Sequence, residues 1–288
     1  MANLEWTPGG KTSARRWYRA QRSVAVYVFA GWCLVPLLWL LEVSLRPGLT
    51  AFASGPLKPF VPTASNYVNV FETGGVGGGL ERSALVVGAS TAIGVLLAVP
   101  VAYVLTHVWD PNSRKVSRVT LFFLASTIAP QIVVILPIFQ LFTAVGLMGS
   151  LVGLGLLYSI MNISLAVLLL RSYFSAVPAE VREAGLTDGG GEWRVMLSCV
   201  VPIARGGLIA TAILCVLQTW NEFLYALVIV GGNHQTLPIV ITSFLTFEGI
   251  NWGQLAAASI IAVVPIVMFS LLVQKDLSRG ISFGAVKQ

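Results

Sequence analysis

The chain has 288 residues, of which 56% are hydrophobic and only 10% are charged, and its mean hydropathy is +0.82. An ordinary globular domain carries about 25% charged residues. The composition therefore excludes a soluble enzyme, a disordered chain and a nucleic-acid-binding module, despite a pI near 9.5. We expect a membrane protein whose net charge of +6 lies in loops and sets its orientation in the bilayer.

Six stretches are long and apolar enough to cross a bilayer, which requires roughly 20 apolar residues in a helix. In chain order they are Val24–Ser44, Ser83–Val108, Val119–Leu147, Leu151–Phe174, Gly206–Val230 and Leu255–Val273. The third stretch contains Pro130 and Pro137, so we expect it to be kinked, tilted or partly re-entrant. The sequence thus predicts an all-α membrane protein with six transmembrane helices.

The loops between these stretches indicate the topology. Fifteen of the eighteen basic residues lie in 1–23, 109–118, 175–205 and 274–288 or at the end of the fourth stretch. Because positively charged residues accumulate on the cytoplasmic side of a membrane protein, we place these segments there. Both termini are therefore expected in the cytoplasm.

The predicted organisation has three parts. They are a cytoplasmic N-terminal segment, 1–23; a transmembrane domain, 24–274, with a cytoplasmic loop at 175–205 and an external loop at 231–254; and a cytoplasmic tail, 275–288. No Ser/His/Asp set, Cys/His pair or phosphate-binding loop of the form G-x-x-x-x-G-K-[ST] occurs in the sequence. We therefore expect no catalytic residue, metal or cofactor on this chain.

The cytoplasmic stretch 175–205 has the pattern of a helix, a sharp turn and a second short helix. Pro178 suits a first helical turn, and Asp188 followed by glycines from Gly189 onward stops the helix. The second helix, which Pro202 is expected to end, carries an apolar stripe at three- and four-residue steps, made of Trp193, Met196, Leu197 and Val200. This stripe either packs against the protein's own helix ends or docks a cytoplasmic partner.

Three motifs carry a resemblance to a known family. The loop resembles the EAA loop of ATP-binding-cassette (ABC) importer permeases, through Glu183, Ala184, Gly185, Asp188, Gly189 and Pro202. Residues 220–223, Trp-Asn-Glu-Phe, resemble the W-N-E-F of sugar-importer permeases, and residues 279–287 resemble their R-G-L-T-x-G-A-V-K tail. Together the motifs resemble the carbohydrate-uptake subfamily, on the side of the shorter permease subunit of the maltose-type pair.

The sequence departs from the EAA pattern at Gly185 and Gly190, where the pattern has alanines. Because each glycine lowers helix stability by about 1 kcal/mol relative to alanine, we expect a looser turn than is usual in the family.

The resemblance implies the type I ABC importer permease fold and a place in the bacterial inner membrane. It implies that the chain forms half of a translocation pathway for a sugar or oligosaccharide. The implied partners are a second permease subunit, two ATPase subunits that hold ATP and Mg, an extracellular solute-binding protein and membrane lipid, but no nucleic acid. The alternatives are the same machinery for a solute such as a glycerol phosphodiester, or a stand-alone secondary transporter, which would be expected to contain an inverted repeat.

The resemblance also assigns an ATPase-coupling site. It would comprise Glu183, Ala184, Gly185, Asp188, Gly189, Trp193, Met196, Val200 and Pro202. Of these, Trp193, Met196 and Val200 would supply the buried contact. Arg182 and Arg194 are expected to pair with acidic groups of the ATPase. A second contact with the ATPase would be made by the tail residues Gly284, Ala285, Val286 and Lys287.

Two further regions are candidates for handling the solute. The external loop corresponds in order to the segment that enters the binding protein's sugar cleft, with candidates Asn233, His234, Gln235, Asn251 and Trp252. An intramembrane carboxylate such as Glu222 usually faces a partner or an aqueous cavity. We expect Glu222 on the translocation path or at a subunit interface, with Gln218, Trp220 and Asn221 on the same face; the alternative is a structural hydrogen bond.

Overall fold

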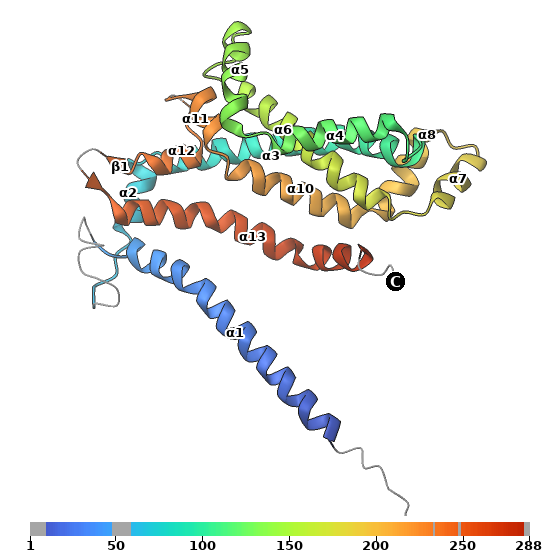
Figure 1. The fold of residues 1–288 in the computed structure, drawn as a ribbon. Coiled ribbons are helices and arrows are strands. Elements are labelled where there is room, and N and C mark those ends of the chain that lie inside the picture. Colours follow the sequence, from blue (N-terminus) through green and yellow to red (C-terminus); the bar gives the residue numbers. More distant parts are fainter. Residues whose placement is uncertain (1–9, 48–58, 233, 247–248, 285–288) are drawn as a thin grey trace, which may run out of the picture.

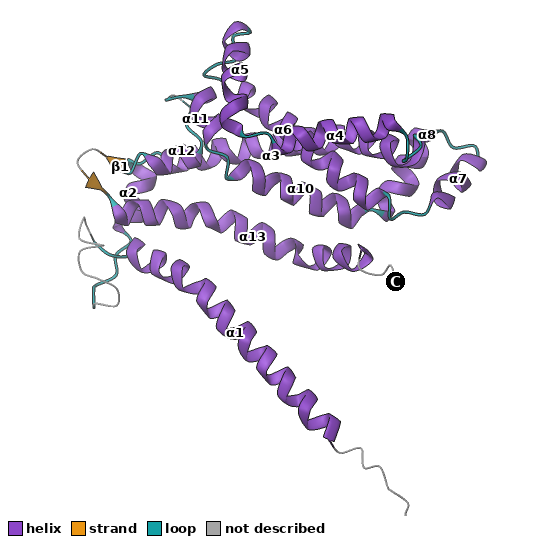
Figure 2. Ribbon diagram, in the orientation of Figure 1, coloured by secondary structure: helices purple, strands orange, loops and turns teal. Residues whose placement is uncertain are grey.

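A computed structural model describes residues 10–47, 59–232, 234–246 and 249–284. Helices make up most of this part of the chain (Figure 2). The first half contains α1 (Gly10–Ser44), α2 (Ser65–Glu72), α3 (Val76–Tyr103), the π-helical segment η2 (Val104–Val108), α4 (Arg114–Ile128), α5 (Gln131–Ala144) and α6 (Leu151–Phe174). The second half contains α7 (Ala179–Thr187), α8 (Glu192–Val195), the π-helical segment η3 (Met196–Val200), α9 (Val201–Ile203), α10 (Arg205–Trp220), α11 (Leu224–Val230), α12 (Leu237–Thr242) and α13 (Trp252–Gly284).

Four helices of the described residues are long and apolar enough to span a membrane: Gln21–Ser44, Val76–Val108, Leu151–Phe174 and Trp252–Leu271. Two bent pairs, α4 with α5 and 192–203 with α10, raise the number to six if each pair is one span. The lipid surroundings favour helices, because a helix satisfies its own backbone hydrogen bonds and lipid offers no hydrogen-bonding groups.

The expected kink in the third span is confirmed and is sharp. The axes of α4 and α5 meet at 96°, with the break at Ala129 and Pro130. Pro130 has no N–H to donate and forces the residue before it out of the helical region, so Ala129 has an extended ψ of 127°.

The prediction of one continuous helix from 206 to 230 is wrong. The helix α10 ends at Trp220, and α11 begins only at Leu224. The break coincides with the W-N-E-F motif, where Glu222 accepts hydrogen bonds from the backbone N–H of Tyr225 at 2.8 Å and of Ala226 at 3.1 Å. The carboxylate thus satisfies donors at the start of α11, which allows a helix to be interrupted within an apolar span.

The centre of the bundle is the pairing of α3 with α6, which is the most extensive helix contact among the described residues. The two backbones approach closely at Gly94, where a Cβ would lie 2.6 Å from the Cβ of Asn162. Small residues at such crossings are typical of membrane helices, which associate through close packing. This close approach fixes the position of α3 relative to α6.

The helices α4, α10 and α13 run along this bundle, and shorter elements lie at its two ends (Figure 1). The helices α7 and α8 lie near the C-terminal end of α13, whereas α2, α12 and the strands β1 (Leu245–Thr246) and β2 (Gly249–Ile250) lie at the opposite end. The strands are antiparallel, with Leu245 opposite Ile250. The helix α1 packs against α13 near its own C-terminal end and diverges from the bundle toward its N-terminus.

The close approach of α3 and α6 generates a stability prediction. Gly94→Leu should lower the free energy of unfolding by about 1–3 kcal/mol because the new side chain overlaps Asn162. Thermal unfolding of the detergent-solubilised protein measures the effect. The matched control is Gly88→Leu in the same helix, where a Cβ meets no atom within 4 Å; equal melting temperatures for the two variants would contradict the prediction.

Candidate coupling site

Residues 175–205, here called the coupling loop, form the expected helix, turn and second helix. The helix α7 starts directly after Pro178, and its C-terminal residue Thr187 is followed by Asp188. Gly189 has φ = +82°, the left-handed conformation that the glycine-rich turn predicts. The helical arrangement after the turn extends from Glu192 through Ile203, so Pro202 lies inside a helical segment and does not end it.

The two unusual glycines permit close packing within the loop, and the expectation of a turn looser than is usual in the family stays a prediction. A Cβ at Gly185 would lie 2.9 Å from Cγ2 of Val195, and a Cβ at Gly190 would lie 2.7 Å from the carbonyl oxygen of Gly185. The N–H of Gly190 donates to that same carbonyl at 3.0 Å. Val195 is buried, with 1% exposure. Glycine therefore brings α7 against α8 more closely than alanine would allow.

The apolar stripe of the second helix is divided between two environments. Met196 and Val200 are 2% and 0% exposed, and both belong to a core cluster with Tyr103 and Phe174. These two side chains pack against the protein's own helix ends, so the expectation that they contact a partner is corrected. Trp193 and Leu197 on the same helix are 67% and 59% exposed. The surface left for a partner is therefore Trp193 with Leu197.

The other expected coupling residues lie on the surface of the loop. Glu183, Ala184, Asp188 and Gly189 are exposed, and Arg194 is exposed on α8. Together with Trp193 they give the loop an outer surface of mixed apolar and charged character. No contact in the described residues assigns them a partner outside the chain, so their role in coupling stays a prediction.

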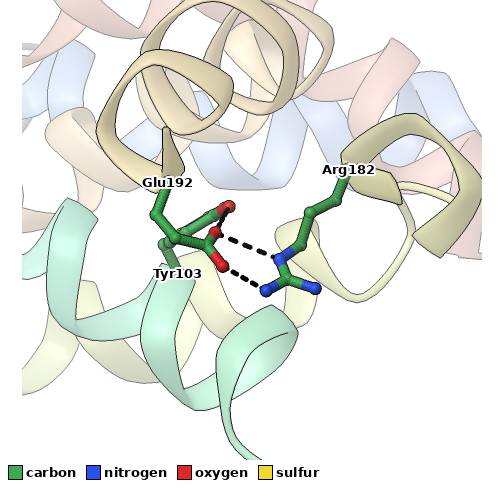
Figure 3. Close-up of polar contacts among 3 residues, drawn as sticks. All are labelled: Tyr103, Arg182 and Glu192. Carbon is green, nitrogen blue, oxygen red and sulfur yellow. Dashed lines mark hydrogen bonds and ion pairs between the residues drawn. The ribbon is translucent and has the colours of Figure 1, made fainter. Parts of the chain in front are cut away.

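Arg182 does not extend outward to meet a partner. Its Nε donates to Oε2 of Glu192 at 3.1 Å, and its guanidinium forms an ion pair with Oε1 of the same carboxylate. The hydroxyl of Tyr103 also donates to Oε2 of Glu192, at 2.6 Å (Figure 3). We call Tyr103, Arg182 and Glu192 the clamp, because they join the end of α3 to α7 and α8. The expected pairing of Arg182 with the ATPase is corrected by this internal pair.

The charges of the clamp reinforce one another. The hydrogen bonds that Arg182 donates to the Glu192 carboxylate lower the pKa of Glu192 and raise the pKa of Arg182. Both groups are therefore ionised at neutral pH. Since the pKa of Glu192 is depressed, the contribution of the pair is present at neutral pH and is lost as the pH falls through that lowered value.

The four candidate path residues do not share a face. Gln218 is half-buried and Asn221 is exposed, whereas Trp220 and Glu222 are 6% and 5% exposed. The indole N–H of Trp220 donates to the carbonyl of Ala262 in α13 at 3.2 Å. The hydroxyl of Tyr158 in α6 donates to Glu222 at 2.7 Å. The structural hydrogen bond that was the alternative for Glu222 is thus present, and a role on the path stays a prediction.

The external loop is more structured than its sequence indicates. It contains α12 and the strand pair, and Trp252 is the first residue of α13, packed beside Val43 and Ala256. Oδ1 of Asn251 accepts from the N–H of Gln254 at 3.3 Å, as an N-cap does. Figure 1 shows this region at the end of the bundle opposite the coupling loop.

Of the other candidates for contact with a binding protein, His234 is exposed, and the carbonyl of Gln235 accepts from Nε of Arg82 at 2.8 Å. Asn233 lies outside the described residues. In the tail, the backbone is helical through Gly284, whereas Ala285, Val286 and Lys287 lie outside the described residues. The contacts proposed for both regions stay predictions.

The contact of Glu192 with Tyr103 and Arg182 was not predicted from the sequence. Glu192 follows Gly191 in the first turn of a helix, a place that any acidic residue favours. Tyr103 lies 89 residues earlier, near the inner end of a predicted span. The only available signal was that both residues fall on the same predicted side of the membrane.

A comparison with known proteins decides the family. Residues 90–283 match the binding-protein-dependent transport system inner membrane component family. The chain belongs to that family. It is a permease subunit of an ABC importer and is embedded in the inner membrane.

Individual relatives agree with this assignment. The trehalose transport system permease protein SugB of Mycobacterium tuberculosis is 32% identical over 89% of this chain and 93% of its own length. The trehalose/maltose transport system permease protein MalG of Thermococcus litoralis is 29% identical over 88% of this chain and 92% of its own length. The resemblance to the carbohydrate-uptake subfamily is thereby confirmed.

Solved structures support the fold. A chain of a bacterial ABC transporter involved in the import of the acidic polysaccharide alginate aligns with a TM-score of 0.63 and 12% identity, over 95% of this permease and all of that chain. The type I importer permease fold is therefore confirmed.

The tight glycine packing generates a second prediction. Gly190→Ala should destabilise the permease by about 1–3 kcal/mol, because its Cβ overlaps a backbone carbonyl that cannot move freely. Limited proteolysis within the coupling loop should speed up correspondingly. Gly191→Ala is the control, since a Cβ there meets no atom within 4 Å. Faster cleavage of the control than of Gly190→Ala would contradict the assigned packing.

Proposed function

We propose that this permease forms half of the pathway for a sugar or oligosaccharide and is driven by ATPase subunits that dock on its coupling loop. The relatives named above transport trehalose and maltose according to their names, and they align over nearly the whole chain. The W-N-E-F sequence at residues 220–223 supports the same solute class through its resemblance to sugar-importer permeases.

The observation that carries the coupling role is the outer surface of the coupling loop. Trp193 and Leu197 are exposed on a short helical segment that is anchored to the bundle by its buried Met196 and Val200. An exposed tryptophan on a rigid support is a typical anchor of a protein interface, because it buries a large area with little loss of side-chain entropy. The exposed Glu183, Asp188 and Arg194 would surround this anchor with charged groups.

The remaining partners complete the proposed assembly. A second permease subunit would supply the other half of the pathway, and the ATPase subunits would hold ATP and Mg. An extracellular binding protein would deliver the solute near His234 and Gln235, at the end of the bundle that is opposite the coupling loop (Figure 1). The tail residues Gly284 to Lys287 would extend the contact with the ATPase.

Uptake by the purified assembly tests the solute class. The complex, isolated through a tag on this chain and reconstituted into proteoliposomes with its binding protein, should accumulate radiolabelled trehalose or maltose when MgATP is present inside. The same vesicles with a non-hydrolysable ATP analogue provide the control. Uptake of glycerophosphodiesters in place of both sugars would contradict the sugar assignment, and ATP-independent uptake by this chain alone would contradict the coupling role.

A substitution at the exposed tryptophan tests the docking surface. Trp193→Ala should weaken retention of the ATPase subunits on the tagged permease by about tenfold or more, as expected on removal of an interface anchor. Quantitative pull-down at increasing dilution measures the effect. Trp32→Ala is the matched control, because Trp32 is 77% exposed and lies in α1, outside the coupling loop. Equal ATPase retention in both variants would contradict docking at Trp193.

A further inference from the structure

We propose that the clamp formed by Tyr103, Arg182 and Glu192 is the connection through which movement of the coupling loop reaches the inner end of α3. This inference rests on the proposed docking of ATPase subunits on the loop. It assigns positioning roles to three residues that touch neither the solute nor ATP. It also names α3 as a helix that the ATPase moves.

The contacts bring three elements to one carboxylate. Glu192 begins α8, Arg182 extends from the middle of α7, and Tyr103 is the last residue of α3 (Figure 3). Both carboxylate oxygens are used, Oε1 by the guanidinium and Oε2 by Nε of Arg182 and the tyrosine hydroxyl. A carboxylate held by three donors has one preferred position, and charge-assisted hydrogen bonds are stronger than neutral ones.

Tyr103 is fixed on the side of α3. It is 2% exposed and belongs to the same core cluster as Phe174 and Met196, and its ring lies 5.5 Å from that of His107. Its hydroxyl is therefore held in place by packing and directed at the loop. The clamp thus joins a rigid residue of the bundle to a rigid residue of the loop.

The loop side is equally constrained. Gly185 and Gly190 allow α7 to pack on Val195, so Arg182 and Glu192 are carried by elements that fit closely together. A displacement of α7 and α8 by a docked partner would therefore act on the clamp as one body. Coupling of this kind needs a rigid element that both ends can bias.

The clamp connects the coupling loop directly to α3, to which the loop has no direct backbone connection. Along the backbone, the loop connects to α6 on one side and to α10 on the other. No direct backbone connection joins it to α3, which ends 76 residues before the start of α7 in the numbering. The segment η2 that follows Tyr103 is π-helical, and such segments are frequently found at functional sites because their backbone geometry is less regular.

The test follows the position of the inner end of α3. Val108, at the end of η2, is 40% exposed and suits a single reporter cysteine after Cys33, Cys199 and Cys215 are replaced by alanine. In the full complex in proteoliposomes, the labelling rate of Val108→Cys by a membrane-impermeant maleimide is measured before and after trapping with MgATP and vanadate. With the clamp intact, trapping should change this rate by about fivefold or more, the range of typical allosteric coupling.

Removing the clamp should abolish the response while the ATPase subunits stay bound. Glu192→Ala should label at the same rate before and after trapping, and Tyr103→Phe, which removes one hydroxyl, should reduce the response in a protein of unchanged fold. The double variant Arg182→Glu with Glu192→Arg should restore it by reversing the pair. The matched control is Glu180→Gln, a substitution of an exposed acid on the same helix as Arg182.

Three outcomes would overturn the inference: no response at Val108→Cys with the clamp intact, an unchanged response in both Glu192→Ala and Tyr103→Phe, or loss of the response in Glu180→Gln as well. Absence of ATPase subunits from the purified native complex is a different result. That absence would contradict the proposed docking and is measured independently of any labelling rate.

Discussion

The burial of Met196 and Val200, two residues of the coupling loop, is the constraint on which the arrangement of that loop depends. These two side chains join Tyr103 and Phe174 in one core cluster, so α8 and η3 are part of the bundle and not a free appendage. Since core residues of this kind hold neighbouring elements in one arrangement, the loop has a defined orientation. That orientation turns Trp193 outward and brings Glu192 within hydrogen-bonding distance of α3.

The glycines of the loop show how a departure from a family pattern gains a structural meaning. Considered alone, Gly185 and Gly190 each lower helix stability. In the folded loop they occupy positions where a methyl group would overlap Val195 or a backbone carbonyl. A general propensity is thus outweighed by a local contact, and the turn is packed more closely. The left-handed Gly189 between them needs no tertiary information, because its conformation follows from the helix end itself.

Much of the fold was predictable because lipid imposes simple rules on length and polarity. The spans at Leu151–Phe174 and near the two termini follow from apolar length alone, and the coupling loop follows from Pro178 and the glycines after Asp188. The break at Glu222 was not predictable from hydropathy, since the residues on both sides are apolar enough to continue a helix. The clamp was not predictable either, because its members come from three elements and meet only after α3, α7 and α8 are packed.

The apolar stripe of the coupling loop is another feature whose packing could not be predicted from the sequence alone. A period of three to four residues identifies a helix with an apolar side, but it does not say what covers that side. Met196 and Val200 are covered by the chain itself, and Trp193 with Leu197 is not. The angular difference between these pairs is small, so the packing of the bundle decides which residues remain available.

The interruption at residues 221–223 has a mechanical consequence. Trp220, the last residue of α10, is hydrogen-bonded to α13, and Glu222 is hydrogen-bonded to α6, so the break is held by two other helices. The arms on either side differ in length, about 24 Å for the 16 residues of α10 and about 10 Å for the 7 residues of α11. The end of α10 is thus tied to α13, and the start of α11 is tied to α6. The break therefore divides the apolar stretch into two helices of unequal length, each fastened to a different neighbour at its broken end.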